Sequence, residues 1–175
     1  MIKVVKRQKS SKNCFVCGLS NEIGFKALFY ELENNTLISV ADCREFYQSY
    51  PERLHGGITA ALLDETMGRA IMIFEPDTWG VTVSLSIDYK SPIPLNQRLR
   101  VTGRITSNRR IFEAEGEIIL EDGTVAAAGK AKYLKMALNK IAPNTTDDNH
   151  ELLYMADIKK DIKEITEYGM FEVVY

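Results

Sequence analysis

The stretch from Leu54 to Ala70 reads LHGGITAALLDETMGRA, and it decides how the rest of the chain folds. Between His55 and Phe74, apolar residues fall on nearly every side of a helical projection. A helix that is apolar all round is buried inside its own domain instead of lying on the surface. The sequence therefore predicts one long central helix, around which the other elements pack.

Short apolar stretches before and after this helix predict strands of an antiparallel sheet: 25–32, 36–40, 81–89, 99–105, 112–120 and 125–138. The last stretch has residues that favour a helix, but Asp122-Gly123 favours a tight hairpin turn into a strand, and we give the turn more weight. Two strands, a buried helix and four further strands make an α+β hotdog fold, in which an antiparallel sheet wraps around one central helix.

Three segments are expected along the chain. Residues 1–12 carry five lysines and arginines and no acid, and we expect a basic, solvated N-terminal tail. Residues 13–138 form the hotdog domain. Residues 139–175 comprise a linker and an added C-terminal amphipathic helix, whose apolar stripe is Leu152, Met155, Ile158, Ile162 and Ile165. We expect this stripe to pack on the domain or on a partner subunit.

Composition limits the class of protein. With 175 residues and 45% apolar content, the chain suits one globular domain. Its 22 basic and 24 acidic residues nearly balance, which argues against a nucleic-acid partner. No apolar run approaches the roughly 20 residues of a membrane span, so no membrane partner is expected. Three cysteines cannot all pair within one chain, which favours a cytoplasmic protein with reduced thiols.

Cys14 and Cys17 form a CxxC pair, which is a common half of a metal site. A structural zinc ion needs four ligands, and the remaining Cys and His candidates are Cys43, His55 and His150. Asp or Glu side chains are an alternative source of ligands, but no second close pair of soft ligands accompanies the CxxC. We therefore expect no metal and no cofactor, and assign this pair no role.

The start of the predicted helix has the features of an anion site. Gly56 and Gly57 let a ligand approach the backbone closely. The free N–H groups of a helix start, together with the helix dipole, favour negative charge. Such a site suits an oxyanion that develops during a reaction.

Asp64 is the unusual side chain of this helix. Glu65 and Arg69 are four residues apart and can pair without any functional role, whereas Asp64 has no such partner. A mostly buried, unpaired carboxylate is costly. Asp64 therefore either reaches solvent or a hydroxyl elsewhere, or is a candidate base or nucleophile.

His55 and Asp64 are nine residues apart, which is about 13 Å along a helix that rises ~1.5 Å per residue. At this distance, His55 and Asp64 of the same chain cannot easily act together on one reacting carbon. If they belong to one site, Asp64 comes from one chain and the His55-Gly56 amides come from another. The spacing then predicts a twofold homodimer.

At these residues the sequence resembles the PaaI-like hotdog-fold thioesterases. The motifs that carry the resemblance are His55-Gly56-Gly57, Asp64-Glu65, Gly80-Val-Thr-Val83 and Tyr89-Lys-Ser-Pro92, together with the opening Cys14-Phe-Val-Cys-Gly18. The resemblance spans roughly residues 13–137. It implies hydrolysis of an acyl thioester, such as an acyl-CoA, without a cofactor.

The resemblance also implies roles for individual residues. Asp64 is the general base or nucleophile at the thioester carbonyl, and the Gly56 amide polarises the carbonyl oxygen from the opposing subunit. His55 orients the thioester. Thr82 falls where the family often has a hydroxyl that positions substrate or water, although a polar residue on the solvent face of a strand is an equally simple interpretation.

Substrate contacts are less specific in this sequence. Relatives often have a side-chain amide six residues before the histidine, where this chain has Ser49 beside Gln48. We take both, with Gly57, as candidate substrate contacts. The phosphates of CoA need cations, and the candidates are Lys90, Arg98, Arg100, Arg104, Arg109 and Arg110. Of these we select Arg109 and Arg110 as the candidate phosphate contacts. The alternative is that both are solvated surface residues without a ligand.

Two other functions remain open. One is a non-catalytic acyl-CoA-binding or scaffold protein, against which Asp64 argues. The other is a hydratase for enoyl thioesters, which needs an acid and a base converging on one carbon, and this requires His55 and Asp64 from different subunits. Acyl length, CoA versus carrier protein, and homodimer versus homotetramer are not readable from the sequence.

Overall fold

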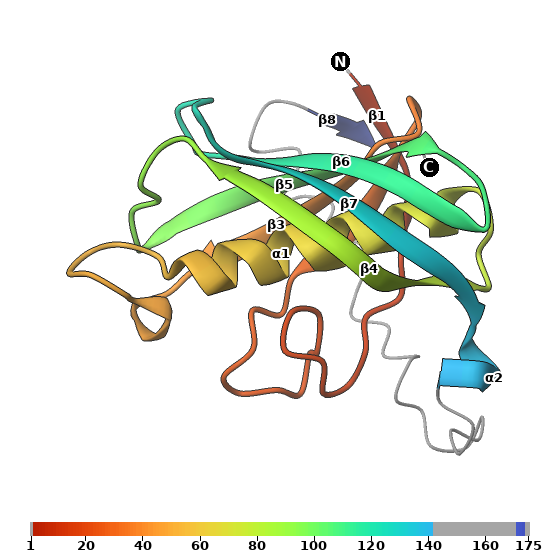
Figure 1. Ribbon diagram of the computed structural model, residues 1–175. Coiled ribbons are helices and arrows are strands. Elements are labelled where there is room, and N and C mark those ends of the chain that lie inside the picture. The colour runs from red at the N-terminus through yellow and green to blue at the C-terminus, as the bar shows by residue number, and fades with distance from the viewer. Residues whose placement is uncertain (1, 142–170, 174–175) are drawn as a thin grey trace.

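The computed structural model describes residues 2–141 and 171–173 (Figure 1). Its one long helix is α1, Gly56–Arg69, continued by a 3-10 turn, Ala70–Ile73. The short helices are η1, Glu45–Tyr47, and α2, Leu138–Ile141. The strands are β1 Ile2–Arg7, β2 Leu28–Leu32, β3 Leu37–Cys43, β4 Thr78–Tyr89, β5 Gln97–Ser107, β6 Ile111–Ile119, β7 Val125–Ala137 and β8 Phe171–Val173.

The strands form one sheet in the order β4-β7-β6-β5-β3-β2-β1-β8. Neighbouring strands are antiparallel except β1 and β8, which are parallel. Figure 1 shows the sheet curving over α1, which runs along its inner face. This arrangement confirms the predicted hotdog fold, and the strand over 125–138 is confirmed as β7 despite its helix-favouring residues.

The core forms between α1 and the inner face of the sheet. Leu62, Leu63 and Met67 of α1 are fully buried. They belong to one apolar cluster that includes Leu99 of β5 and Phe112 of β6. Burial of a leucine side chain stabilises a fold by about 1.5–3 kcal/mol, so this contact fixes the position of α1. The predicted central helix is therefore confirmed.

The prediction of a solvated N-terminal tail is wrong for residues 2–7. These residues form β1, which pairs antiparallel with β2. Val4 is buried in a second, smaller cluster with Tyr30, Leu32 and Ile38. The physical reason is that the backbone N–H and C=O groups on one side of β2 need hydrogen-bond partners. A short strand with one inward-facing apolar side chain provides them.

Two predicted features have other outcomes. The predicted C-terminal helix with its stripe, Leu152 to Ile165, lies outside the described residues. The predicted central helix over 55–74 is α-helical from Gly56 to Arg69, and its last turn is 3-10. In the described part of the chain, no helix has both the length and the apolar character needed to cross a membrane.

Candidate active site

The start of α1 is built by hydrogen bonds from three directions. The His55 backbone N donates to Tyr47 O at 2.9 Å, which fixes the entry of the chain into the helix. His55 is the N-cap residue, and its Nδ1 accepts from Gly57 N at 2.9 Å. Tyr89 of β4 donates its hydroxyl to Gly56 O at 2.9 Å.

These contacts distinguish the two glycine amides. The Gly57 N–H is occupied by the His55 ring, and the next amide, Ile58 N, donates to His55 O at 3.0 Å. Within residues 2–141 and 171–173, the Gly56 N–H has no hydrogen-bond acceptor. The Gly56 amide is thus the helix-start donor that remains for a ligand.

Asp64 lies in the middle of α1 and is held by two hydroxyls from the sheet. Thr82 Oγ1, from β4, lies 3.0 Å from Asp64 Oδ1 and 3.1 Å from Oδ2. Tyr133, from β7, donates its hydroxyl to Asp64 Oδ1 at 3.1 Å and to the backbone O of Asp64 at 2.9 Å. Asp64 therefore has the hydroxyl partners that its own helix does not supply.

The environment tunes the charge of this carboxyl group. Burial raises the pKa of Asp64 above its usual value, while the hydrogen bonds from Thr82 and Tyr133 lower it in part. Burial and the Asp64 charge raise the pKa of Tyr133, so that its hydroxyl stays protonated and acts as a donor. An ionised carboxylate with two donors and partial burial has the properties of a base or a nucleophile.

The Thr82 hydroxyl contacts Asp64, although the side chain of Thr82 is largely exposed. Asp64 and Thr82 therefore lie together, whereas Gly56, the first residue of α1, and its N-cap His55 lie eight and nine residues before Asp64. The two halves of the predicted site are about 13 Å apart along one helix.

Tyr133 is a site residue that sequence reasoning missed. It is almost completely buried, and its ring stacks on Phe112 with 4.9 Å between ring centroids. A tyrosine inside an apolar strand needs a hydrogen-bond partner for its hydroxyl. That requirement was the available signal, but it does not reveal that the partner is Asp64, 69 positions earlier.

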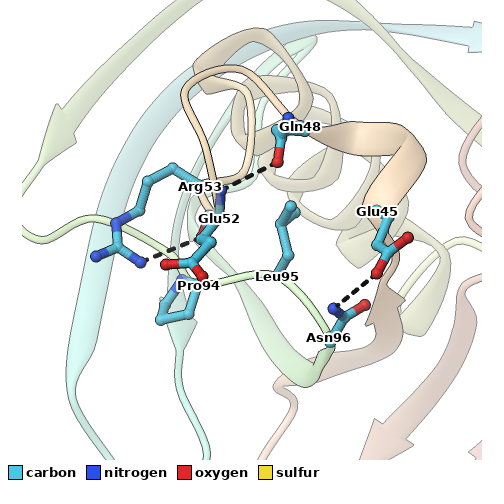
Figure 2. Close-up of a pocket in the computed structure, with 7 residues that line it drawn as sticks. All are labelled: Glu45, Gln48, Glu52, Arg53, Pro94, Leu95 and Asn96. Atoms are coloured by element: carbon cyan, nitrogen blue, oxygen red, sulfur yellow. Dashed lines mark hydrogen bonds between the residues drawn. The ribbon is translucent and has the colours of Figure 1, made fainter.

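A pocket of about 480 Å³ lies beside the loop that precedes α1 (Figure 2). Its lining residues are Glu45, Gln48, Glu52, Arg53, Pro94, Leu95 and Asn96. Gln48 Oε1 accepts from Glu52 N at 3.0 Å, so its amide helps to hold this loop. Ser49 Oγ accepts from Tyr50 N in the same loop. The pocket includes neither Asp64 nor Thr82, and its two carboxylates do not favour a polyphosphate.

Arg109 and Arg110 are exposed on the turn between β5 and β6. Arg110 O accepts from Lys135 N at 3.0 Å, and Lys135 pairs with Gly80 of β4. The turn thus adjoins the start of β4 and the end of β7. Within one chain, Arg109 and Arg110 therefore lie toward the end of β7 that carries Tyr133. Gln48 and Ser49 lie elsewhere, at the start of α1.

Comparison with known proteins identifies relatives of this chain. Residues 52–127 match the family model described as thioesterase superfamily. The acyl-coenzyme A thioesterase THEM4 of Rattus norvegicus is 26% identical over 136 residues, which cover 76% of this chain and 58% of that protein. The chain therefore spans less than two thirds of the length of this curated relative.

Solved structures lead to the same superfamily. A crystal structure of a thioesterase superfamily protein has a TM-score of 0.63 and 28% identity, and covers 69% of this chain and 59% of that chain. A Bacillus halodurans protein crystallised with CoA has a TM-score of 0.52 and 27% identity, and covers 57% of this chain and 66% of that chain.

Proposed function

We propose that the chain hydrolyses an acyl-CoA thioester to a free acid and a thiol, because its residues 52–127 match the model of the thioesterase superfamily. The observation that carries the proposal is the Asp64 carboxylate, held between the hydroxyls of Thr82 and Tyr133. The name of the THEM4 relative and the CoA complex of the Bacillus halodurans relative support coenzyme A as the carrier.

In this proposal Asp64 acts on the thioester carbonyl. Its ionised carboxylate either takes a proton from the attacking water or attacks the carbonyl carbon itself. Thr82 and Tyr133 hold the carboxylate in one orientation. As the carbon becomes tetrahedral, its oxygen gains negative charge, which the Gly56 N–H at the positive end of α1 stabilises. His55 uses Nδ1 for Gly57, which leaves Nε2 to orient the thioester.

The proposed site needs two subunits. Asp64 of one chain and Gly56 of the same chain are too far apart to act on one carbonyl, so the Gly56 amide comes from a partner. β4 supports such a pairing, because it is a 12-residue strand at one end of the sheet order. Val81, Val83 and Tyr89 on this strand are exposed. A long apolar edge strand is normally covered, and a second β4 across a twofold axis would cover it.

The proposal also includes substrate contacts. We assign the phosphates of CoA to Arg109 and Arg110, whose guanidinium groups bind phosphate oxygens well. Gln48, Ser49 and Gly57 lie near the start of α1 and are assigned to the approach of the acyl thioester.

The test is release of free thiol from acyl-CoAs ranging from acetyl to palmitoyl, with an aromatic acyl-CoA included. Wild type is compared with Asp64→Asn and with Asp77→Asn, a control that makes the same chemical change at an exposed residue before β4. We expect turnover in wild type and in the control, and a loss of about a hundredfold or more in Asp64→Asn. Saturable acyl-CoA binding without turnover would replace the proposal with the non-catalytic binding protein.

A further inference from the structure

The side of α1 that bears Glu65 contacts the N-terminal turn that contains the CxxC pair. The Sγ atoms of Cys14 and Cys17 and a carboxylate oxygen of Glu65 all lie within 4.8 Å of one another. Zinc binds sulfur at about 2.3 Å and carboxylate oxygen at about 2.0–2.2 Å, so ligand atoms around one ion lie roughly 3.5–4 Å apart. A small contraction of this cluster would bring all three atoms to one ion.

The CxxC turn is shaped to present sulfur ligands. The backbone N–H groups of Val16 and Cys17 donate to Cys14 Sγ at 3.3 and 3.4 Å. Gly18 N donates to Cys14 O at 2.8 Å, and a Cβ at Gly18 would lie only 2.3 Å from that oxygen. The turn therefore requires a glycine directly after the pair. N–H donors aimed at sulfur stabilise a thiolate, which is the form that binds metal.

Arg69 provides a second layer around the same cluster. Its buried guanidinium donates to Glu65 Oε1 at 2.7 Å and lies 3.0 Å from Cys17 Sγ. A third N–H donates to Lys9 O at 3.0 Å, which fixes the side chain. Donors of this kind orient metal ligands and hold them in their charged form.

With protonated thiols, Glu65 and Arg69 form a neutral pair, and a divalent cation restores that neutrality once both cysteines ionise to bind it. Two thiolates and Glu65 carry three negative charges, and Arg69 carries one positive charge. A divalent ion makes this partly buried group neutral, and a neutral group avoids the cost of an uncompensated buried charge. Thiolate sulfur selects zinc or a similar soft ion over magnesium or calcium.

We infer that Cys14, Cys17 and Glu65 bind one zinc ion, with Arg69 orienting the Glu65 and Cys17 ligands and water in the fourth position. The sequence alone predicts no metal here, because the third ligand is a carboxylate that lies 48 positions after Cys17. The ion ties the N-terminal turn to α1 next to Asp64. The inference does not depend on the proposed thioesterase activity.

The experiment titrates the reduced, metal-free full chain with Co²⁺, whose bond to thiolate gives a charge-transfer absorption, and then displaces Co²⁺ with Zn²⁺. We expect one ion per chain. Cys14→Ser and Cys17→Ser should lose the absorption and weaken binding at least tenfold. Cys43→Ser is the matched control, because Cys43 is a buried cysteine of β3 outside the cluster.

Glu65→Gln is a second variant that keeps both thiols, and circular dichroism shows whether each variant is folded. We expect Glu65→Gln to weaken Zn²⁺ binding by at least tenfold. The inference is overturned if reduced wild type shows no thiolate–cobalt absorption, or if folded Cys14→Ser or Glu65→Gln binds Zn²⁺ as tightly as wild type. A chain that forms a Cys14–Cys17 disulfide and binds no Zn²⁺ after reduction also overturns it.

Discussion

Replacing Tyr133 with Phe should shift the pH dependence of catalysis. The change removes one hydroxyl that donates to Asp64 Oδ1 at 3.1 Å and leaves the ring packed on Phe112. A hydrogen bond to a charged group contributes about 1.5–3 kcal/mol. Because Asp64 is only half-buried, the lower figure applies, and about 1.4 kcal/mol corresponds to one pKa unit. The pKa of Asp64 should therefore rise by about one unit.

The assay is kcat/KM for an acyl-CoA as a function of pH. In the proposed mechanism Asp64 acts in its ionised form, so the acid limb of the profile in Tyr133→Phe should lie about one pH unit above that of wild type. Tyr47→Phe is the matched control, since it removes a buried hydroxyl that donates to Gly24 O at 2.8 Å without contacting Asp64. The control should lower stability and leave the acid limb in place.

An acid limb in Tyr133→Phe that coincides with that of wild type would refute this reasoning. It would mean that the group titrating in the profile is not the carboxylate that Tyr133 contacts. A shift of equal size in Tyr47→Phe would also refute it, because the effect would then reflect a general loosening of the fold.

Two further predictions concern stability. Burial raises the pKa of Asp64 in the folded chain. The Asp64 carboxyl group therefore adds to the free energy of unfolding at pH values below its ordinary pKa of 3.8, and this contribution is lost as the pH rises through the pKa in the folded chain. In calorimetry, Asp64→Asn should therefore unfold at a higher temperature than wild type at neutral pH, and at the same temperature at pH ~3. A difference in unfolding temperature that does not change with pH would contradict this. Gly103→Ala places a Cβ 2.7 Å from Thr66 O of α1 and should cost about 1–3 kcal/mol in urea unfolding. An unchanged midpoint would show that α1 does not pack this closely on β5.

The sequence predicts the elements whose signal is local. The all-round apolar helix, the alternating strands and the Asp122-Gly123 turn each depend on neighbours within a few residues. β1 was missed, because its one buried side chain, Val4, is surrounded by cations that are typical of a solvated segment. Strand pairing with β2, about 25 residues later, decides its structure.

The candidate site divides in the same way. The helix start and the unpaired Asp64 follow from spacing along one helix. The contacts of Asp64 with Thr82 and Tyr133 join residues 18 and 69 positions apart, and they depend on how β4 and β7 pair. The cluster of Cys14, Cys17 and Glu65 also depends on contacts between distant parts of the chain, because α1 must be in place before Glu65 reaches the turn.

The central claim is that Asp64 of one subunit acts with the Gly56 amide of its partner, and subunit complementation tests it directly. Gly56→Pro removes that N–H. Proline is tolerated at the first helical position, and the extended His55 backbone, with ψ of 132°, suits a residue before proline. A Cβ at position 56 meets Tyr89 at an ordinary 3.5 Å. The variant should fold and lose activity, as Asp64→Asn should.

The measurement is acyl-CoA hydrolysis by a heterodimer purified through two tags, with one Asp64→Asn subunit and one Gly56→Pro subunit. If each site combines Asp64 of one chain with Gly56 of the other, one of the two sites keeps both groups. The heterodimer should then recover about half of the wild-type activity, while both parent homodimers stay inactive. A heterodimer as inactive as its parents would contradict a site shared between subunits.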